Sequence, residues 1–291
     1  MRILLLTHAF NSLTQRVFVD LRAAGHDVSV EFDVNDAVTQ EAVALWQPDV
    51  VVAPFLKRRI PDAVWRSVRC LVVHPGVVGD RGPSALDWAI MDGEAAWGVT
   101  VLEANGEMDA GDVWATAEFA MRGAAKGSLY RHEVTEAATT ALGEALARIA
   151  RGERPTPLAM FGDRARGRVR PLARQPDRAI DWSADDTATV LRKVRAADGV
   201  PGVLDAVGGE AVYLYDAHAE GGLAALRAGA APGAVVAWRD GAILRATVDG
   251  AVWITHLKRA DGPEPRLKLP AQAILRDRLA GVPEAPLAPD A

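Results

Sequence analysis

The sequence is poor in the features that several classes of protein need. A single cysteine, Cys70, in 291 residues excludes an intramolecular disulfide framework and a cysteine-rich metal site. No apolar run approaches the roughly 18 residues of a membrane-spanning helix, and the opening MRILLL is too short for a signal peptide. The formal charge of −5 argues against nucleic-acid binding, which needs a basic surface. We therefore expect a cytoplasmic protein that binds neither membranes nor nucleic acids.

Three common ligand-binding motifs are also missing. The chain contains no G-x-G-x-x-G dinucleotide loop, no G-x-x-x-x-G-K-[ST] phosphate loop and no H-E-x-x-H zinc motif. We therefore predict no metal. What the chain does have is 49% hydrophobic and 24% charged residues, which is enough to bury a core and excludes disorder as the main state. The length suits two domains.

The first half of the chain alternates between strand-like and helix-like patterns. Short apolar runs at residues 3–6, 28–32, 50–53 and 70–73 predict strands, and apolar residues at helical spacing lie between them. Such alternation predicts an open, Rossmann-like, mostly parallel α/β sheet over residues 1–150. Further elements are expected as a helix at 84–91, strands at 97–102 and 112–119, and a long helix at 128–150 with Ser128 as its N-cap.

The second half changes in composition. Residues 151–178 are rich in Arg, Pro and Gly, and we interpret them as a linker. Residues 179–260 contain one helical pattern, at 187–197, followed by four β-like runs with Asp-Gly turns, which predicts a small OB-like β-barrel. Residues 261–291 are expected to form a partly disordered tail.

Two residues stand out as candidates for acid–base chemistry. His74 ends a buried strand at the edge of the sheet where ligands of such folds bind, and Asp109 lies in a loop between two strands. An ordinary surface histidine and a turn-forming aspartate are the plain alternatives, so position alone leaves both roles open. Cys70 has apolar neighbours in a strand and is expected to be a buried, inert thiol.

Several segments, however, occur in a characteristic order. They are THAFNSLTQ at 7–15, APFLK at 53–57, HPGVVGDRGPSALDW at 74–88, MDAGD at 108–112, SLYR at 128–131 and IDWS at 180–183. With them the chain resembles the formyltransferases that use 10-formyltetrahydrofolate, a family that includes methionyl-tRNA formyltransferase. Within that family it resembles the formyltransferase portion of the HypX/HoxX hydrogenase maturation factors.

The resemblance implies transfer of the formyl group of 10-formyltetrahydrofolate to the thiol of coenzyme A. This would be the first step of carbon monoxide synthesis for a nickel-iron hydrogenase. Proteins of the HypX type add an enoyl-CoA hydratase-like domain after the barrel, and this sequence stops near where that domain would begin. We therefore expect such a domain as a partner, either in a longer form of this protein or in a separate chain. Two alternatives stay open: transfer to an amine, on a small metabolite or an aminoacyl-tRNA, and a non-catalytic folate-binding scaffold. Residues 183–257 hold nine acidic and six basic side chains, which opposes tRNA binding.

The same resemblance implies the roles of individual residues. His74 would stabilise the oxyanion and protonate the leaving N10 atom, while Asp109 orients it. One departure is Val72, which stands where the family has an asparagine that binds the oxyanion; Ser84 and Asn105 are the candidate replacements. The expected folate-binding residues are Phe55, Leu56, Lys57, Arg59 and Asn105, and the expected acceptor-binding residues are Asn11, Ser12, Thr14, Arg81, Ser84 and Arg131.

Overall fold

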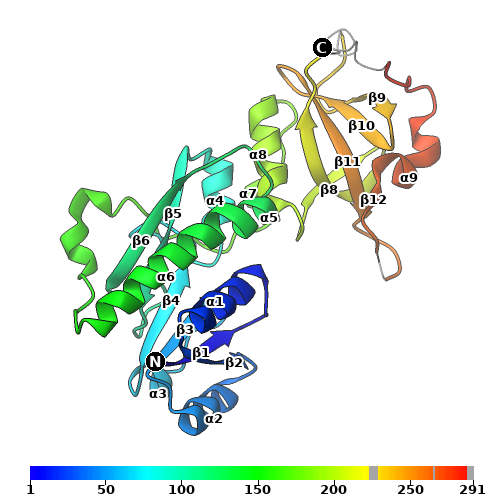
Figure 1. Ribbon diagram of the computed structural model, residues 1–291. Coiled ribbons are helices and arrows are strands. Elements are labelled where there is room, and N and C mark those ends of the chain that lie inside the picture. Colours follow the sequence, from blue (N-terminus) through cyan, green and yellow to red (C-terminus); the bar gives the residue numbers. More distant parts are fainter. Residues whose placement is uncertain (223–228, 265, 287–291) are drawn as a thin grey trace. The chain divides into compact units, whose positions relative to one another are not determined.

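The computed structural model describes residues 1–222, 229–264 and 266–286 (Figure 1). The chain divides into two compact units. Unit 1 contains Met1–Leu86, Ala95–Arg122 and Ser128–Leu172. Unit 2 contains Asp87–Glu94, Gly123–Gly127 and the described residues from Ala173 onward. Unit 2 is therefore built partly from segments of the first half of the chain.

Unit 1 is organised around a six-stranded sheet of order β2-β1-β3-β4-β5-β6. The first four strands pair in parallel, whereas β5 and β6 are antiparallel to their neighbours. This confirms the prediction of an open, mostly parallel α/β sheet. The strands are β1 (Arg2–Thr7), β2 (Asp27–Phe32), β3 (Val50–Phe55), β4 (Arg69–His74), β5 (Ala96–Glu103) and β6 (Val113–Ala120).

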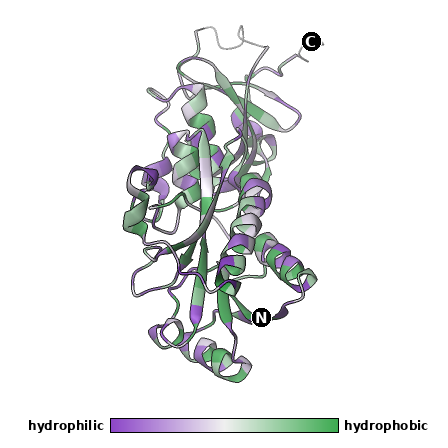
Figure 2. Ribbon diagram, turned by 60° about the vertical axis from the view of Figure 1, so that its left-hand side comes forward, coloured by the Kyte–Doolittle hydropathy of each residue, from purple (hydrophilic) through white to green (hydrophobic). Residues whose placement is uncertain are grey.

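Helices cover this sheet, as the runs of apolar residues in its strands require. β3 is buried on both faces from Val50 to Ala53, which is typical of a parallel sheet with helices on either side. Figure 2 shows the strands of this unit coloured mainly as hydrophobic. The helices of unit 1 are α1 (Ser12–Ala23), α2 (Asp36–Trp46), α3 (Asp62–Trp65) and α6 (Thr135–Ala150). Two further helices, α4 (Ala85–Asp92) and α5 (Lys126–Leu129), include residues that are assigned to unit 2.

The long helix expected at 128–150 differs at its start. Its first turn is α5, which begins at Lys126, so Ser128 lies inside a helical turn and is not the N-cap. Tyr130–Val134 then forms a π-helical turn before α6 begins. The Thr135 hydroxyl donates to the carbonyl of Tyr130, five residues back, at 2.8 Å. The expectation of one continuous α-helix therefore misses a widened turn, a rare feature that occurs mostly as single turns within α-helices.

Unit 2 contains a six-stranded antiparallel sheet. Its order is β7-β8-β11-β10-β9, with β12 added beside β11. The predicted helix at 187–197 is confirmed as α8 (Thr187–Ala197), and Asp240-Gly241 forms the turn of the β9–β10 hairpin with positive φ at both residues. The strands are β7 (Val203–Val207), β8 (Glu210–Ala219), β9 (Val235–Arg239), β10 (Ala242–Ala246), β11 (Ala251–Arg259) and β12 (Leu269–Pro270).

Segments expected as linker and tail carry more structure than their composition indicated. The segment after Ala150 includes a 3-10 helix, Leu158–Arg164, and the short helix α7 (Gln175–Arg178). Beyond β12, the helix α9 (Ala271–Leu275) and a 3-10 turn, Arg276–Leu279, contribute buried residues to the core of unit 2. Ala285 is buried and its backbone bonds to Trp238, so this part of the expected tail is packed against unit 2. Residues 287–291 lie outside the described part.

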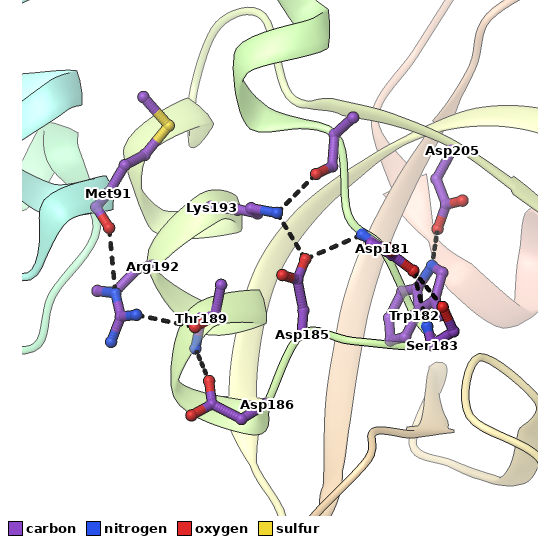
Figure 3. A network of polar contacts seen from close by, with 11 residues as sticks. Met91, Asp181, Trp182, Ser183, Asp185, Asp186, Thr189, Arg192, Lys193 and Asp205 are labelled. Atoms are coloured by element: carbon purple, nitrogen blue, oxygen red, sulfur yellow. Dashed lines mark hydrogen bonds and ion pairs between the residues drawn. The ribbon is translucent and has the colours of Figure 1, made fainter.

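A polar network fixes α8 within unit 2 (Figure 3). Arg192 donates from Nε to the carbonyl of Met91 at 3.2 Å, and Lys193 bonds to Asp185. The indole of Trp182 donates to Asp205 at 3.0 Å. Arg192 thus ties the 87–94 segment to α8, whereas Trp182 ties the IDWS motif to residue 205 in the strand after that helix. Within the described residues, no helix combines the length and apolar character that crossing a bilayer needs.

Candidate active site

His74 ends β4, at the carboxyl edge of the parallel strands. The residue is only 4% exposed. Its backbone pairs with Thr100 of β5, and the Thr100 hydroxyl donates to the carbonyl of Gly76 at 2.8 Å. The last strand residue and the turn after it are therefore fixed by the neighbouring strand. This places an imidazole where ligands bind in open α/β sheets.

Two carboxylates flank the imidazole of His74, one at each ring nitrogen. Nε2 lies 2.9 Å from Oδ1 of Asp80, and Nδ1 lies 3.6 Å from Oδ2 of Asp109. The side chains are 5%, 3% and 10% exposed for His74, Asp80 and Asp109 respectively, so solvent screens these charges weakly. The predicted pair of His74 and Asp109 thus meets in a buried site, together with an acid that sequence reasoning missed.

The Asp109 loop turns sharply to reach His74. Asp109 has a positive φ of 54°, a conformation that aspartate tolerates better than most residues. Its Oδ2 also accepts a hydrogen bond from the backbone N–H of Gly82 at 3.1 Å. Two residues later, any Cβ on Gly111 would lie 1.6 Å from the carbonyl oxygen of Glu103, so only glycine fits there.

The Asp80 loop is held by a segment expected to be linker. The N–H of Asp80 bonds to the carbonyl of Val77 at 2.9 Å, closing a turn. Arg81 exchanges backbone hydrogen bonds with both neighbours of Val169, accepting from Arg170 at 2.9 Å and donating to Arg168 at 3.0 Å. Residues 167–170 therefore act as a short strand that positions this acid, a role that their Arg- and Gly-rich composition does not reveal.

The residues expected to bind folate lie on two adjoining loops. Phe55 and Leu56 are half-buried at the end of β3, and Lys57 is exposed. The guanidinium of Arg59 donates to the carbonyl of Gly106 and lies 3.2 Å from Asp62. Asn105 accepts from the N–H of Glu107 at 2.8 Å. The structure thus brings the 55–59 loop beside the 105–109 loop that carries Asp109.

The first helix contributes a second group of predicted residues. Asn11 caps α1 by accepting from the N–H of Thr14 at 3.0 Å, and its amide donates to the hydroxyl of Tyr130 at 3.3 Å. Burial raises the pKa of Tyr130 to about 12, although the Asn11 bond opposes the shift. The Thr14 hydroxyl is buried, with Thr7 at 3.1 Å. Ser12, the first residue of α1, is half-buried.

The remaining predicted residues are spread over other elements. Arg81 donates to Glu107 at 2.7 Å, which joins the loop after His74 to the Asp109 loop. Ser84 is buried just before α4, and Arg131 is exposed on the π-helical turn beside Tyr130. Within the described chain, no hydrogen bond or ion pair joins Asn11, Ser12, Thr14 or Arg131 directly to His74 or Asp109.

Two further positions on β4 bear on the chemistry. Val72 packs, partly buried, against the apolar cluster that includes Leu4 and Val51, and it offers no hydrogen-bond donor. Burial, followed by the charge of Glu103, raises the pKa of Cys70 to about 12, so this thiol stays protonated. Among the residues that the structure describes, no three His, Cys, Asp or Glu side chains are grouped as metal ligands would be.

Asp80 was overlooked because the residue types around it indicate only a turn. It lies between Gly79 and Arg81, six residues after His74. The signal that could have identified it is the pair of glycines, Gly76 and Gly79, on the path between the two side chains. Glycines there allow the chain to fold back, so that an acid can reach the histidine that precedes them.

The fold and this site define a formyl transferase. The N-terminal domain model of that family, "Formyl transferase", matches residues 12–146, and the "Formyl transferase, C-terminal domain" model matches residues 173–272. The chain belongs to this family and carries both of its domains.

Within the family, the chain is similar to hydrogenase maturation factors. It is 55% identical over 286 residues to hydrogenase maturation factor HoxX of Bradyrhizobium diazoefficiens, covering 98% of this chain and 49% of HoxX. A crystal structure of HypX from Aquifex aeolicus in complex with tetrahydrofolic acid matches with a TM-score of 0.89 and 48% identity, over 100% of this chain and 50% of that one. Methionyl-tRNA formyltransferase of Ralstonia nicotianae is 29% identical over 260 residues, or 86% of this chain and 73% of that enzyme. The chain thus spans about half the length of HoxX and HypX.

Proposed function

We propose that this chain transfers the formyl group of 10-formyltetrahydrofolate to the thiol of coenzyme A in the cytoplasm. The observation that carries the proposal is the buried pair of His74 and Asp109, 3.6 Å apart, in a chain 48% identical to a HypX solved with tetrahydrofolic acid. The product, formyl-CoA, would yield carbon monoxide and free coenzyme A on a hydratase-like domain, for hydrogenase maturation.

The reaction exchanges a carbon–nitrogen bond for a carbon–sulfur bond. The thiol sulfur adds to the formyl carbon, and the bond from that carbon to N10 breaks. The thiol proton ends on N10, so no other reactant is needed. A thiol has an unperturbed pKa of about 8.5, so it releases its proton more readily than a protonated amine does. An imidazole that takes up and returns one proton supplies what this reaction needs.

The burial of His74 suits this role. A proton donor in a water-poor site stabilises the oxyanion of the tetrahedral intermediate more strongly than it would in water. Asp109 would orient the ring and stabilise its charged form. Because Val72 lacks a donor, a group such as Ser84 or Asn105 would replace the asparagine of related enzymes.

Binding of the two substrates would fall to separate groups. The 55–59 and 105–109 loops, which meet through Arg59 and Gly106, are the proposed pterin site, lined by Phe55, Leu56, Lys57, Arg59 and Asn105. The N-terminus of α1 has free N–H groups that favour anions. Asn11 and Ser12 there, with Arg81, Ser84 and Arg131, are the proposed residues for the acceptor and its phosphates. Thr14, also expected to bind the acceptor, is fully buried, and its hydroxyl bonds to Thr7 and Ala9 instead.

Transfer of a labelled formyl group tests the proposal. Wild-type chain, His74→Ala and the control His218→Ala would be incubated with [14C]formyl-tetrahydrofolate and coenzyme A. The histidine of the control is exposed, in unit 2. We expect labelled formyl-CoA from the wild type and the control, and a rate lower by about 10²–10⁴ in His74→Ala, since that is the usual contribution of acid–base catalysis.

Other acceptors distinguish the alternatives in the same assay. Label that appears only on methionyl-tRNA or an amino sugar would contradict the thiol acceptor and establish transfer to an amine. Folate binding without transfer to any of these acceptors would indicate a non-catalytic folate-binding scaffold. Equal rates in His74→Ala and the wild type would remove His74 from the mechanism.

A further inference from the structure

Asp80 is the more buried of the two acids in contact with His74, and the mechanism proposed above gives it no role. Its carboxylate is 3% exposed and its Oδ1 lies 2.9 Å from Nε2, a normal hydrogen-bond distance. The Asp109 carboxylate, at 3.6 Å from Nδ1, is beyond that distance and accepts a hydrogen bond from Gly82. Of the two acids, Asp80 therefore makes the tighter contact with the ring.

The chain is shaped to allow this contact. A Cβ at residue 76 would lie 2.4 Å from Nε2 of His74 and 2.7 Å from Oδ1 of Asp80, so a side chain there would separate the pair. A Cβ at residue 167 would lie 1.8 Å from the backbone nitrogen of Asp80. Neither position has room for a side chain, so both must be glycine. The turn after β4 and the 167–170 segment therefore both pack closely around the hydrogen bond between His74 and Asp80.

We propose that Asp80 is a positioning residue that holds the proton of His74 on Nε2 and turns Nδ1 toward the reacting formyl group. A carboxylate only accepts hydrogen bonds, so the neutral ring must carry its proton on Nε2 to satisfy Asp80. Nδ1 is then the nitrogen with a free lone pair, on the side of Asp109 and the 105–109 loop. The inference rests on the proposed function for its kinetic consequence, although the tautomer itself does not depend on it.

In this assignment Asp80 and Asp109 have different roles, because they contact different nitrogens of the ring. Nε2 stays bonded to Asp80 throughout, and Nδ1 takes the proton from the attacking thiol and returns it to N10. The lone pair of Nδ1 first accepts the thiol proton. When the carbon–nitrogen bond breaks, its electron pair remains on N10 and accepts that proton from Nδ1. The ring is then neutral again, and both products are formed without a net change in charge. Asp109, on the Nδ1 side, would then stabilise the intermediate imidazolium while Asp80 fixes the plane of the ring.

The test replaces the carboxylate by an amide of the same shape, Asp80→Asn. Exchanging the carboxylate partner of a catalytic histidine for an amide lowers kcat by up to about 10⁴ in a protease, because the amide favours the wrong tautomer. We expect kcat for formyl transfer to decrease by a factor of about 10²–10⁴, with little change in KM for the folate. The matched control is Asp205→Asn, a largely buried acid of unit 2 that pairs with Arg245, and it should keep wild-type kcat.

A spectroscopic measurement separates positioning from simple stability. The ¹⁵N shifts of the His74 ring, read in the resting protein without substrate, report which nitrogen is protonated. We expect Nε2–H in the wild type and in Asp205→Asn, and a gain of Nδ1–H in Asp80→Asn. A wild-type ring protonated on Nδ1, or an Asp80→Asn variant with unchanged kcat, would overturn the proposal. If the wild type transfers no formyl group but its ring is Nε2–H, the proposed function fails and the tautomer assignment stands.

Discussion

The thiol of Cys70 lies four residues before His74 on β4 and is 1% exposed. With its pKa raised to about 12 by burial, only about one molecule in 10⁴ carries the reactive thiolate at pH 8. An unburied thiol, with a pKa near 8.5, is deprotonated in about a quarter of molecules at that pH. We therefore expect Cys70 of the native protein to react with a thiol-specific disulfide reagent at least about 10³ times more slowly than in the unfolded chain.

The measurement is the absorbance released by the reagent before and after guanidinium is added. One equivalent should appear only after unfolding, and Cys70→Ala should release none. If native protein released a full equivalent of the chromophore at once, the burial of Cys70 in β4 would be contradicted.

At the scale of single residues, the sequence could identify His74 and Asp109 as candidates, because each occurs within a segment that other formyltransferases share. It could not identify Asp80, whose contact depends on a turn and on backbone hydrogen bonds from residues 167–170, about 90 positions away. Spacing patterns report neighbours within one element, whereas this contact arises between a turn and a distant segment.

At the scale of elements, the turn after β4 leaves no room for a side chain at residue 76. Gly76→Ala would place a methyl group 2.4 Å from Nε2 of His74, so the ring or Asp80 must move. We expect a kcat loss of about 10²-fold or more, since loss of positioning by about 1 Å has that effect. Formyl transfer by the purified variant is the measurement.

The matched control is Gly143→Ala in α6, where an added Cβ meets nothing within 4 Å. Alanine is more favourable than glycine inside a helix by about 1 kcal/mol, so this variant should be more stable and equally active. If Gly76→Ala were as active as Gly143→Ala, the close packing around His74 would be contradicted.

Helices and strands could be predicted from the sequence wherever their apolar residues follow a simple pattern. The central strands were predicted because they are short, continuous apolar runs, and α8 was predicted because its apolar positions recur at helical spacing. β7 was missed, since only its end residues, Val203 and Val207, are buried and no alternation runs between them. The π-helical turn at Tyr130 and the packed segment beyond Leu269 were also missed, because a hydroxyl-to-carbonyl bond and tertiary contacts decide them.

At the scale of the whole molecule, unit 2 depends on segments far from it in sequence. Arg178 is 2% exposed in its side chain, and its Nη2 lies 3.3 Å from Asp87 and 2.9 Å from the carbonyl of Ala173. Asp87 also binds Lys126 at 3.1 Å. The three segments of unit 2 thus meet at one carboxylate, Asp87. A division of the sequence into a first and a second half hides this dependence.

Asp87→Ala therefore tests whether unit 2 is discontinuous. It would leave the guanidinium of Arg178 buried without its carboxylate, which typically costs about 3–5 kcal/mol of stability. Glu144→Ala is the control, because its pair with Arg151 is more than half exposed on both sides and such pairs contribute at most about 1 kcal/mol. Urea unfolding gives the loss of stability, and hydrogen exchange locates it. We expect faster exchange in residues 87–94, 123–127 and from 173 onward; faster exchange confined to unit 1, or the same stability in both variants, would contradict the assignment of these segments to one unit.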